Sequence, residues 1–345
     1  MNSKRKPYML TNQNSTAFWL IDTLWMPLAT SHHTQDNFSL LEQVCPVGGP
    51  QTHMHPTDEG MYILDGHVTF QVGGQEVKAG PGTLASIPRY TEHSFVVDRP
   101  ETRVLNFYTP GGFETIIMSL GIPAPERKIP EPGITPMPAS WMAMEASREF
   151  GQIGAPTMPF ADPPTDENRL TKPSETNPTT PHSVELDRAP AFWLESSLFT
   201  VIATKEQTGG SYSLLHQRLQ EGPGPAPHSH EQDEALYVLE GELTLIAGEE
   251  RFTATAGSFV YIPEGTIHTF RVESAEAQLL NWYLPGGFEQ VVQQGGVPAS
   301  AREFPLKPEK SSQTAAQRRF LLERVGMTVV AIADPPQSKP EFENA

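Results

Sequence analysis

Cysteine, positive charge and long apolar runs are all scarce in this chain of 345 residues. The single cysteine, Cys45, cannot form an internal disulfide, which fits a reducing compartment such as the cytoplasm. The chain has 24 Lys and Arg against 41 Asp and Glu, a formal net charge of −17. Such a surface repels nucleic-acid phosphates and anionic lipids. No stretch approaches the roughly 20 apolar residues of a membrane helix. We therefore expect a cytoplasmic protein that binds neither nucleic acid nor membrane.

An internal repeat runs along almost the whole chain. The sequence FWL at 18–20 returns at 192–194, LNFY at 105–108 returns as LNWY at 280–283, and PGGFE occurs at 110–114 and 285–289. The length also favours about two domains. We therefore predict an N-terminal domain over residues 1–160, a Pro-rich linker over 161–182 and a C-terminal domain over 183–345.

Short β-strands dominate each copy of the repeat. The 34 prolines favour turns between strands over helices. Asp65-Gly66 and Glu240-Gly241 each separate two apolar runs, which predicts a β-hairpin at both places. One helix per copy is expected after the strands, at about 140–150 and about 313–325. The predicted fold is all-β, with two tandem double-stranded β-helix (jelly-roll) barrels, each followed by a short helix.

Each copy also contains three histidines and one glutamate at the same spacing. On a strand, residues two apart point to the same face, here the interior of the barrel. Three imidazoles and one carboxylate suit a divalent transition metal and leave coordination positions open. We predict one such metal in each domain, and this ligand set accepts Fe, Mn, Cu, Ni or Co. The predicted ligands are His53, His55, Glu59 and His93 in the first copy and His228, His230, Glu234 and His268 in the second.

The acids beside the two glutamates, Asp58 and Asp233, have the opposite parity along the strand. We expect both carboxylates to point away from the metal.

This pattern resembles the cupin superfamily, and specifically the bicupins. The family motifs are G-x5-H-x-H-x3,4-E-x6-G and G-x5-P-x-G-x2-H-x3-N. The second copy matches them through its ligands and five further residues, Gly222, Gly241, Gly257, Pro263 and Gly265. The final Asn is replaced in both copies, by Val97 and Val272. In the first copy, Gly48 lies one residue too close to the histidines, and Tyr90 replaces a glycine. Tyrosine tolerates positive φ poorly, so the second copy is the more regular site.

The layout is similar to that of the bicupin quercetin 2,3-dioxygenases. That resemblance implies a metal-dependent dioxygenase that cleaves a flavonol (quercetin-like) or a similar enolisable aromatic with O2. Glu59 or Glu234 would be metal ligand and general base. Four aromatic side chains are candidates for a pocket wall, with ordinary core packing as the alternative: Phe95, Phe107, Phe270 and Trp282.

Two other functions stay open at this point. One is a bicupin decarboxylase or oxidase of a small organic acid such as oxalate, although relatives of that type usually have four residues before the glutamate. The other is a non-catalytic bicupin that binds a metal or a ligand. The expected partners are a small aromatic substrate and O2, and the chain is expected to be a monomer or a homodimer.

Overall fold

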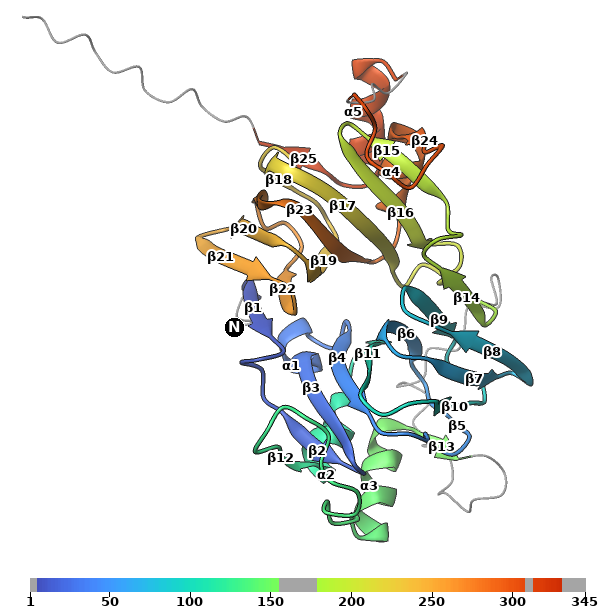
Figure 1. Cartoon of the computed structure of the whole chain (residues 1–345). Helices are drawn as coiled ribbons and strands as arrows, with labels where there is room; N and C mark the ends of the chain where they lie inside the picture. Colours follow the sequence, from blue (N-terminus) through green and yellow to red (C-terminus); the bar gives the residue numbers. More distant parts are fainter. Residues whose placement is uncertain (1–4, 155–178, 308–312, 331–345) are drawn as a thin grey trace, which may run out of the picture.

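The computed structural model describes residues 5–154, 179–307 and 313–330, which form two β-rich halves of similar construction (Figure 1). Residues 161–178 of the predicted linker lie outside the described residues. The two halves resemble each other strand by strand, as the repeat predicts.

The N-terminal half consists of two sheets that pack face to face. Side chains from both sheets, including Ile63, Phe70 and Val104, form one buried apolar cluster between them. The larger sheet contains, in order, β12 (Ile122–Pro123), β2 (Phe18–Leu20), β3 (Thr23–Ala29), β4 (Ser39–Cys45), β11 (Thr102–Thr109), β6 (Asp58–Asp65), β9 (Thr83–Ile87) and β14 (His182–Glu185). The smaller sheet contains β13 (Ile153–Gly154), β5 (His53–Met54), β10 (His93–Val97), β7 (Val68–Val72) and β8 (Gln75–Ala79).

The C-terminal half repeats this plan, but hydrogen bonds join its strands β15 to β25, together with β1 (Tyr8–Thr11) of the N-terminal half, into one sheet of 12. The reason is β23 (His268–Leu284), a strand of 17 residues that pairs with strands on both sides of the fold. The main path runs through β22 (Ser258–Ile262), β19 (Asp233–Glu240), β23, β17 (Ser213–Pro223), β16 (Ser197–Ala203), β15 (Ala191–Leu194) and β24 (Val297–Pro298). The branches are β18 (His228–Ser229), β20 (Glu242–Ala247), β21 (Glu250–Thr255) and β25 (Thr328–Val329).

Each half adds one edge strand to the large sheet of the other. Strand β1 (Tyr8–Thr11) pairs antiparallel with β22, so that Tyr8 lies opposite Tyr261. Strand β14 pairs in the same way with β9, with His182 opposite Ser86. Both exchanged strands cover backbone groups that would otherwise form an open sheet edge.

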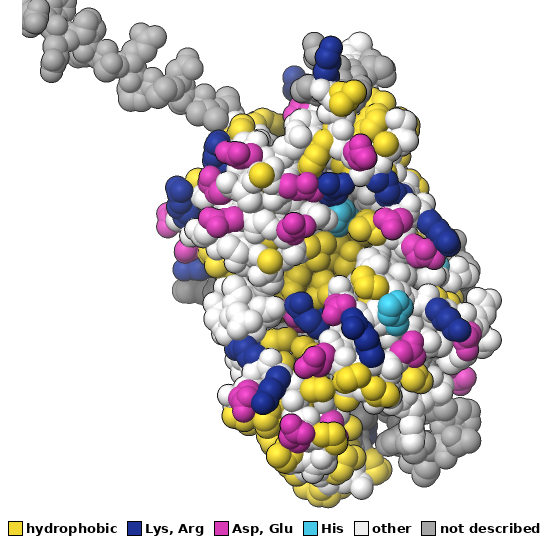
Figure 2. Space-filling view, in the orientation of Figure 1, with side chains coloured by type: hydrophobic (Ala, Val, Ile, Leu, Met, Phe, Trp, Pro, Cys, Tyr) yellow, Lys and Arg dark blue, Asp and Glu magenta, His cyan; other side chains and the backbone are white. Residues whose placement is uncertain are grey.

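A second apolar core lies between the halves and buries the outer faces of the two large sheets. It includes Leu40, Phe107 and Leu105 from one half and Tyr237 and Trp282 from the other. The rings of Phe107 and Trp282 stack across the interface, with centroids 5.9 Å apart. On the visible surface, hydrophobic side chains gather between the two halves (Figure 2). Both faces of each large sheet are therefore apolar and buried.

Reciprocal hydrogen bonds join the halves next to the metal-binding motifs. The Asn37 side-chain N–H donates to Asp233 Oδ2 at 2.7 Å, and the Ser211 hydroxyl donates to Asp58 Oδ2 at 3.0 Å. Asp58 also accepts from Arg89, at 2.8 Å from Nη2 to Oδ2. The prediction that both aspartates point away from the histidines is confirmed.

The described residues contain more helices than the sequence predicts, two more in the first copy and one more in the second. The expected helices are α3 (Ser140–Phe150) and α5 (Ala315–Arg324). The structure adds α1 (Ser31–Thr34) and, after each PGGF sequence, α2 (Glu114–Leu120) and α4 (Glu289–Gly295). Helices of seven residues make only two turns, too few for a clear 3.6-residue periodicity. Within the described parts of the chain, no helix combines the length and the apolar character needed to cross a membrane.

The two predicted hairpins at Asp-Gly and Glu-Gly are wrong. Strand β6 pairs with β11 and β9, whereas β7 pairs with β10 and β8, so the chain passes from one sheet to the other at Asp65-Gly66. At this corner Gly66 has φ of 94°, and a Cβ would lie 2.1 Å from Thr102 Oγ1. The glycine is required by the corner, because no larger residue fits there.

Gly48 occupies the same structural place as Gly222 despite its displacement in sequence. Gly48 bridges Val97, and Gly222 pairs with Val272, the residue that corresponds to Val97 in the second copy. Both glycines have positive φ, 106° and 134°. The chain has one residue fewer between Gly48 and His53 than between Gly222 and His228, and this difference leaves the pairing of the glycine unchanged.

Tyr90 adopts the backbone conformation of the glycine that it replaces. Its φ is 61°, against 69° for Gly265, and each backbone N–H donates at 2.8 Å to a histidine carbonyl, that of His55 or His230. A non-glycine residue in this region costs about 1 kcal/mol. We expect Gly265→Ala to lower the free energy of unfolding by about 1 kcal/mol, because its Cβ meets nothing within 4 Å and only strain is added. Tyr90→Gly should lower the free energy of unfolding by much less, and urea denaturation of both variants measures the difference.

Candidate metal centres

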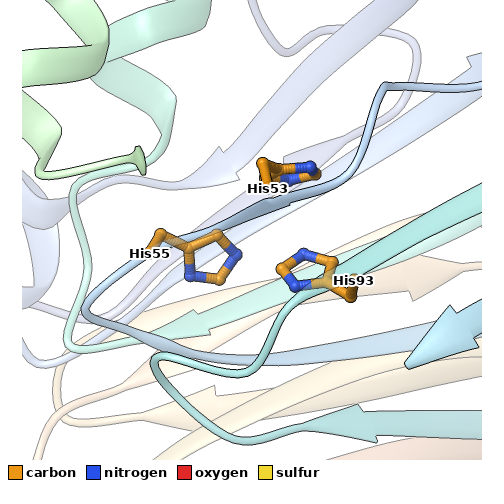
Figure 3. A group of neighbouring side chains, drawn as sticks. All are labelled: His53, His55 and His93. Carbon is orange, nitrogen blue, oxygen red and sulfur yellow. The ribbon is translucent and has the colours of Figure 1, made fainter. Parts of the chain in front are cut away.

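Three histidine side chains of the N-terminal half converge inside the fold. His53 lies on β5, His55 follows it closely, and His93 begins β10, which pairs with β5 through His93 and His53. One ligand nitrogen from each ring lies within 4.8 Å of the other two. The rings point toward one another from two neighbouring segments (Figure 3). His55 and His93 are almost fully buried, at 1% and 2% exposed.

The C-terminal half brings His228, His230 and His268 together in the same way. The ring centroids of His228 and His268 lie 4.2 Å apart, against 4.3 Å for His53 and His93. The six histidines predicted from the repeat therefore form two equivalent groups.

Backbone carbonyls fix the orientation of all six rings. Each Nδ1 lies 2.8 to 3.0 Å from a carbonyl oxygen two residues away in the chain. A carbonyl can only accept, so each Nδ1 carries the hydrogen and each neutral ring keeps a free lone pair on Nε2. This is how metal-binding histidines are held in proteins. The carbonyls belong to Gln51, Thr57, Thr91, Ala226, Gln232 and Thr266.

A carboxylate oxygen lies next to each group of histidines. Glu59 Oε2 lies 3.3 Å from His55 Nε2 and 3.1 Å from His93 Nε2. Glu234 Oε2 lies 3.0 and 2.9 Å from the corresponding atoms of His230 and His268. Ligands about 2.1 Å from a metal are about 3.0 Å apart at octahedral angles and about 3.4 Å apart at tetrahedral angles. The glutamate oxygen and these two histidine nitrogens therefore have a spacing that is compatible with a shared metal ion.

Burial and mutual contacts set the charges of these groups. Burial, with a smaller effect from His93, lowers the pKa of His53 to about 4, so its ring is neutral at pH 7. Burial opposes ionisation of Glu59, but hydrogen bonds from His55 and His93 outweigh it and hold the pKa of Glu59 well below its usual value. His228 and Glu234 shift in the same directions. Burial lowers the pKa of His93, but the contact with Glu59 raises it by more, so the pKa lies above its usual value. A bound cation would displace the proton that this contact stabilises on the ring.

Both halves match the model of the cupin domain, over residues 41–107 and 215–283. The chain is a bicupin. It is 23% identical over 313 residues to quercetin 2,3-dioxygenase from Bacillus subtilis strain 168, with 89% of this chain and 90% of that protein covered. Each domain of the bicupin holds one three-histidine metal-binding group.

Solved structures of oxalate decarboxylase from Bacillus subtilis share the fold of this bicupin. One structure, at pH 4.6, superposes with a TM-score of 0.54 at 13% identity and covers 83% of this chain and 78% of its own. A second, determined in work on its Mn(II) centres, gives a TM-score of 0.56, also at 13% identity, and covers 83% and 79%. At 13% identity, this similarity shows only that the two proteins arrange their strands in the same way.

Two of the four predicted pocket residues do not lie beside the histidines of the bicupin. Phe107 and Trp282 belong to the core between the domains. Their strands carry Tyr108 and Tyr283 on the other face, toward the glutamates. Phe107 and Trp282 therefore follow the alternative of core packing and do not form a pocket wall beside the histidines. Phe95 and Phe270 share the inward face of their histidines and pack against the interior clusters. Whether they contact a substrate stays a prediction.

Sequence reasoning missed the residues that hold the glutamates. The Tyr108 hydroxyl donates to Glu59 Oε1 at 2.9 Å. In the second domain the Asn281 side-chain N–H donates to Glu234 Oε1 at 2.7 Å and to the Tyr283 hydroxyl at 2.8 Å, and Tyr283 itself also hydrogen-bonds to Glu234. The signal was present in the repeat, because LNFY and LNWY place Asn and Tyr two apart on one strand face.

We expect Tyr108→Phe to weaken metal binding in the N-terminal domain by about 10- to 100-fold, the usual effect of losing a group that orients a ligand. Tyr283→Phe is the matched control and should have a smaller effect, because Asn281 still donates to Glu234 Oε1 when the Tyr283 hydroxyl is removed. Metal retained per chain after dialysis against a chelator measures both. Equal retention by the two variants would contradict the different roles of the tyrosines.

Proposed function

We propose that this bicupin is a metal-dependent dioxygenase that cleaves a flavonol, or a similar enolisable aromatic, with O2. The observation that carries the proposal is a donor set of three imidazoles and one carboxylate facing an apolar, aromatic interior. The likeness to quercetin 2,3-dioxygenase supports it. On this proposal all eight predicted ligands, including Glu59 and Glu234, bind one metal per domain.

The chain's own groups would bind and deprotonate the substrate. Glu59 is ionised, so its carboxylate can accept the proton of a substrate hydroxyl. Burial, reinforced by Glu59, holds the pKa of Tyr108 well above its usual value, so the phenol stays protonated and keeps donating to Oε1. When bound, the metal supplies Lewis-acid stabilisation of the resulting enolate and a place for O2.

Aromatic side chains shield this chemistry from water. Phe113 stacks on Tyr108 with ring centroids 4.3 Å apart, and Phe150, at the end of α3, lies 5.7 Å from His55. In the second domain Phe288 stacks on Tyr283 at 4.0 Å. Val325 lies in the same cluster as these two rings.

The second candidate is a decarboxylase or oxidase of a small acid such as oxalate, and the fold shared with oxalate decarboxylase favours it. A small dianion needs cationic partners as well as a metal. Among the described residues, however, the buried polar and charged side chains include no Lys or Arg. We therefore place the aromatic substrate first.

The test is to measure metal per chain and then follow quercetin absorbance, O2 uptake and carbon monoxide release, with oxalate assayed in parallel. We expect one metal per domain and O2 consumption that depends on both the metal and quercetin. Full metal occupancy without flavonol turnover would refute the proposal. Oxalate consumption in that case would favour the second candidate, and metal without either reaction would favour a non-catalytic binding protein.

A further inference from the structure

The interior of the N-terminal domain contains polar atoms that have no partner. Both amide atoms of Gln43 are buried without a hydrogen bond, and the side chain is 1% exposed. The indole N–H of Trp25 is also buried without an acceptor. Each such atom costs free energy in the folded protein. A cost of this kind is expected where a protein has a use for the group.

These groups share one face of the large sheet, the face that carries the metal site. Gln43 on β4 lies opposite Trp25 on β3 and opposite Val104 on β11. Val104 belongs to the interior apolar cluster, and Tyr108, four residues further along β11 on the same face, donates to Glu59. Trp25 packs with Tyr108 and Phe113 in a neighbouring cluster. Gln43 therefore lies inside the domain, where these two clusters meet.

The C-terminal domain lacks this feature at the equivalent positions. Phe199, which has no polar atom in its side chain, corresponds to Trp25. Gln217 corresponds to Gln43, but it hydrogen-bonds to Tyr283. Side-chain oxygens of Asn106 and Asn281 are unpartnered in both domains, so they do not distinguish the sites. The difference between the domains rests on Gln43 and Trp25.

We propose that Gln43 and Trp25 form the polar end of a substrate site whose other end is the N-terminal metal centre. This inference rests on the proposed function and narrows it. The amide offers an NH2 group that donates and a carbonyl oxygen that accepts, and the indole offers one N–H donor, which suits a hydroxyl or carbonyl group rather than an ion. Four residues along a strand span about 13 Å. A molecule bound at the metal must therefore contain two or three rings to reach Gln43, which a small acid cannot do.

Gln43→Leu and Trp25→Phe test this site, the latter because it copies Phe199. We expect either change to raise KM for quercetin, by about tenfold for Gln43→Leu. Neither should raise KM for 3-hydroxyflavone, which keeps the metal-binding hydroxyl and lacks the distant ones. Metal content should stay unchanged. If the KM values for both flavonols rise equally, or neither changes, the inference is overturned.

Thermal stability provides a second, independent readout. Removing an unpartnered buried amide should raise Tm of Gln43→Leu by about 2–4 °C. Gln217→Leu is the matched control and should lower Tm, because its amide is hydrogen-bonded. A lower Tm in Gln43→Leu would show that the amide has a structural partner and would also overturn the inference.

Binding without O2 separates this inference from the proposed function. If the wild type binds both flavonols but cleaves neither, the proposed reaction fails while the ratio of their Kd values still tests Gln43. If the wild type turns over quercetin and Gln43→Leu leaves the ratio of the KM values for quercetin and 3-hydroxyflavone unchanged, only the inference fails. If the wild type binds neither flavonol, both fail.

Discussion

Glu59→Ala should lower flavonol turnover by about 10²- to 10⁴-fold, the range over which a positioned base contributes. The reason is that Glu59 is the ionised acceptor nearest to two of the metal-binding nitrogens, at 3.3 and 3.1 Å. Glu234→Ala should have a much smaller effect on this reaction, because the unpartnered Gln43 and Trp25 groups that would bind the distant end of the substrate lie in the N-terminal domain. Initial rates of quercetin loss and O2 uptake measure both variants.

Two controls separate catalysis from metal loss. Glu59→Gln keeps the shape and the hydrogen bond from Tyr108 but removes the charge, so it should lose turnover as well. Metal content measured on the same samples shows whether the centre is still occupied. If Glu234→Ala abolishes turnover while Glu59→Ala retains it, the C-terminal domain is the catalytic one. If neither variant loses turnover, no glutamate is the base.

The structure removes the main reason for preferring the C-terminal site. The sequence marks the first copy as irregular at Gly48 and Tyr90. Both residues nevertheless occupy the backbone positions of Gly222 and Gly265, with positive φ and the same hydrogen-bonded partners. Local strain at Tyr90 is small beside the interactions that hold the surrounding turn. A residue that departs from a motif can therefore add local backbone strain and still leave the geometry of the site unchanged.

The histidine groups could be predicted because their signal is local. His53 and His55 share parity within one segment, and the repeat supplied the matching His93 and a second full set. The two unused aspartates were also placed correctly by parity. Such inferences need only a strand and one known inward residue.

The aromatic residues could not be placed because both faces of the large sheets are buried. In β11 the alternation of Asn106 and Tyr108 with Phe107 shows two faces but does not show which one is the interior. Phe107 is apolar because a second domain covers it. The exchanged strands are beyond sequence reasoning for a related reason, since the pairing of β1 with β22 joins residues about 250 positions apart. No local pattern reports a partner at that separation.

Asp233→Ala should lower the free energy of unfolding by about 3 kcal/mol. Asp233 is 2% exposed and accepts hydrogen bonds from Arg5, from the Asn37 side chain at 2.7 Å and from the Glu264 backbone at 2.9 Å. Without it, the Arg5 guanidinium keeps only the exposed Glu264, 3.3 Å away, as a carboxylate partner. Removing one partner of a fully buried ion pair costs about 3–5 kcal/mol. The Arg5 side chain is 16% exposed, so we take the lower end.

Asp65→Ala provides the control for this prediction. Asp65 pairs with Arg99 at 2.6 Å, but both side chains are more than half exposed, so its loss should cost no more than about 1 kcal/mol. Urea denaturation followed by tryptophan fluorescence compares the two variants. Arg5, which precedes β1, and Asn37 both belong to the N-terminal domain, whereas Asp233 belongs to the C-terminal domain. Asp233→Ala therefore also removes hydrogen bonds across the domain interface. A single transition with an unchanged slope would mean that the shared core of Phe107 and Trp282 still makes the domains unfold together, whereas two transitions would show that Asp233 couples them.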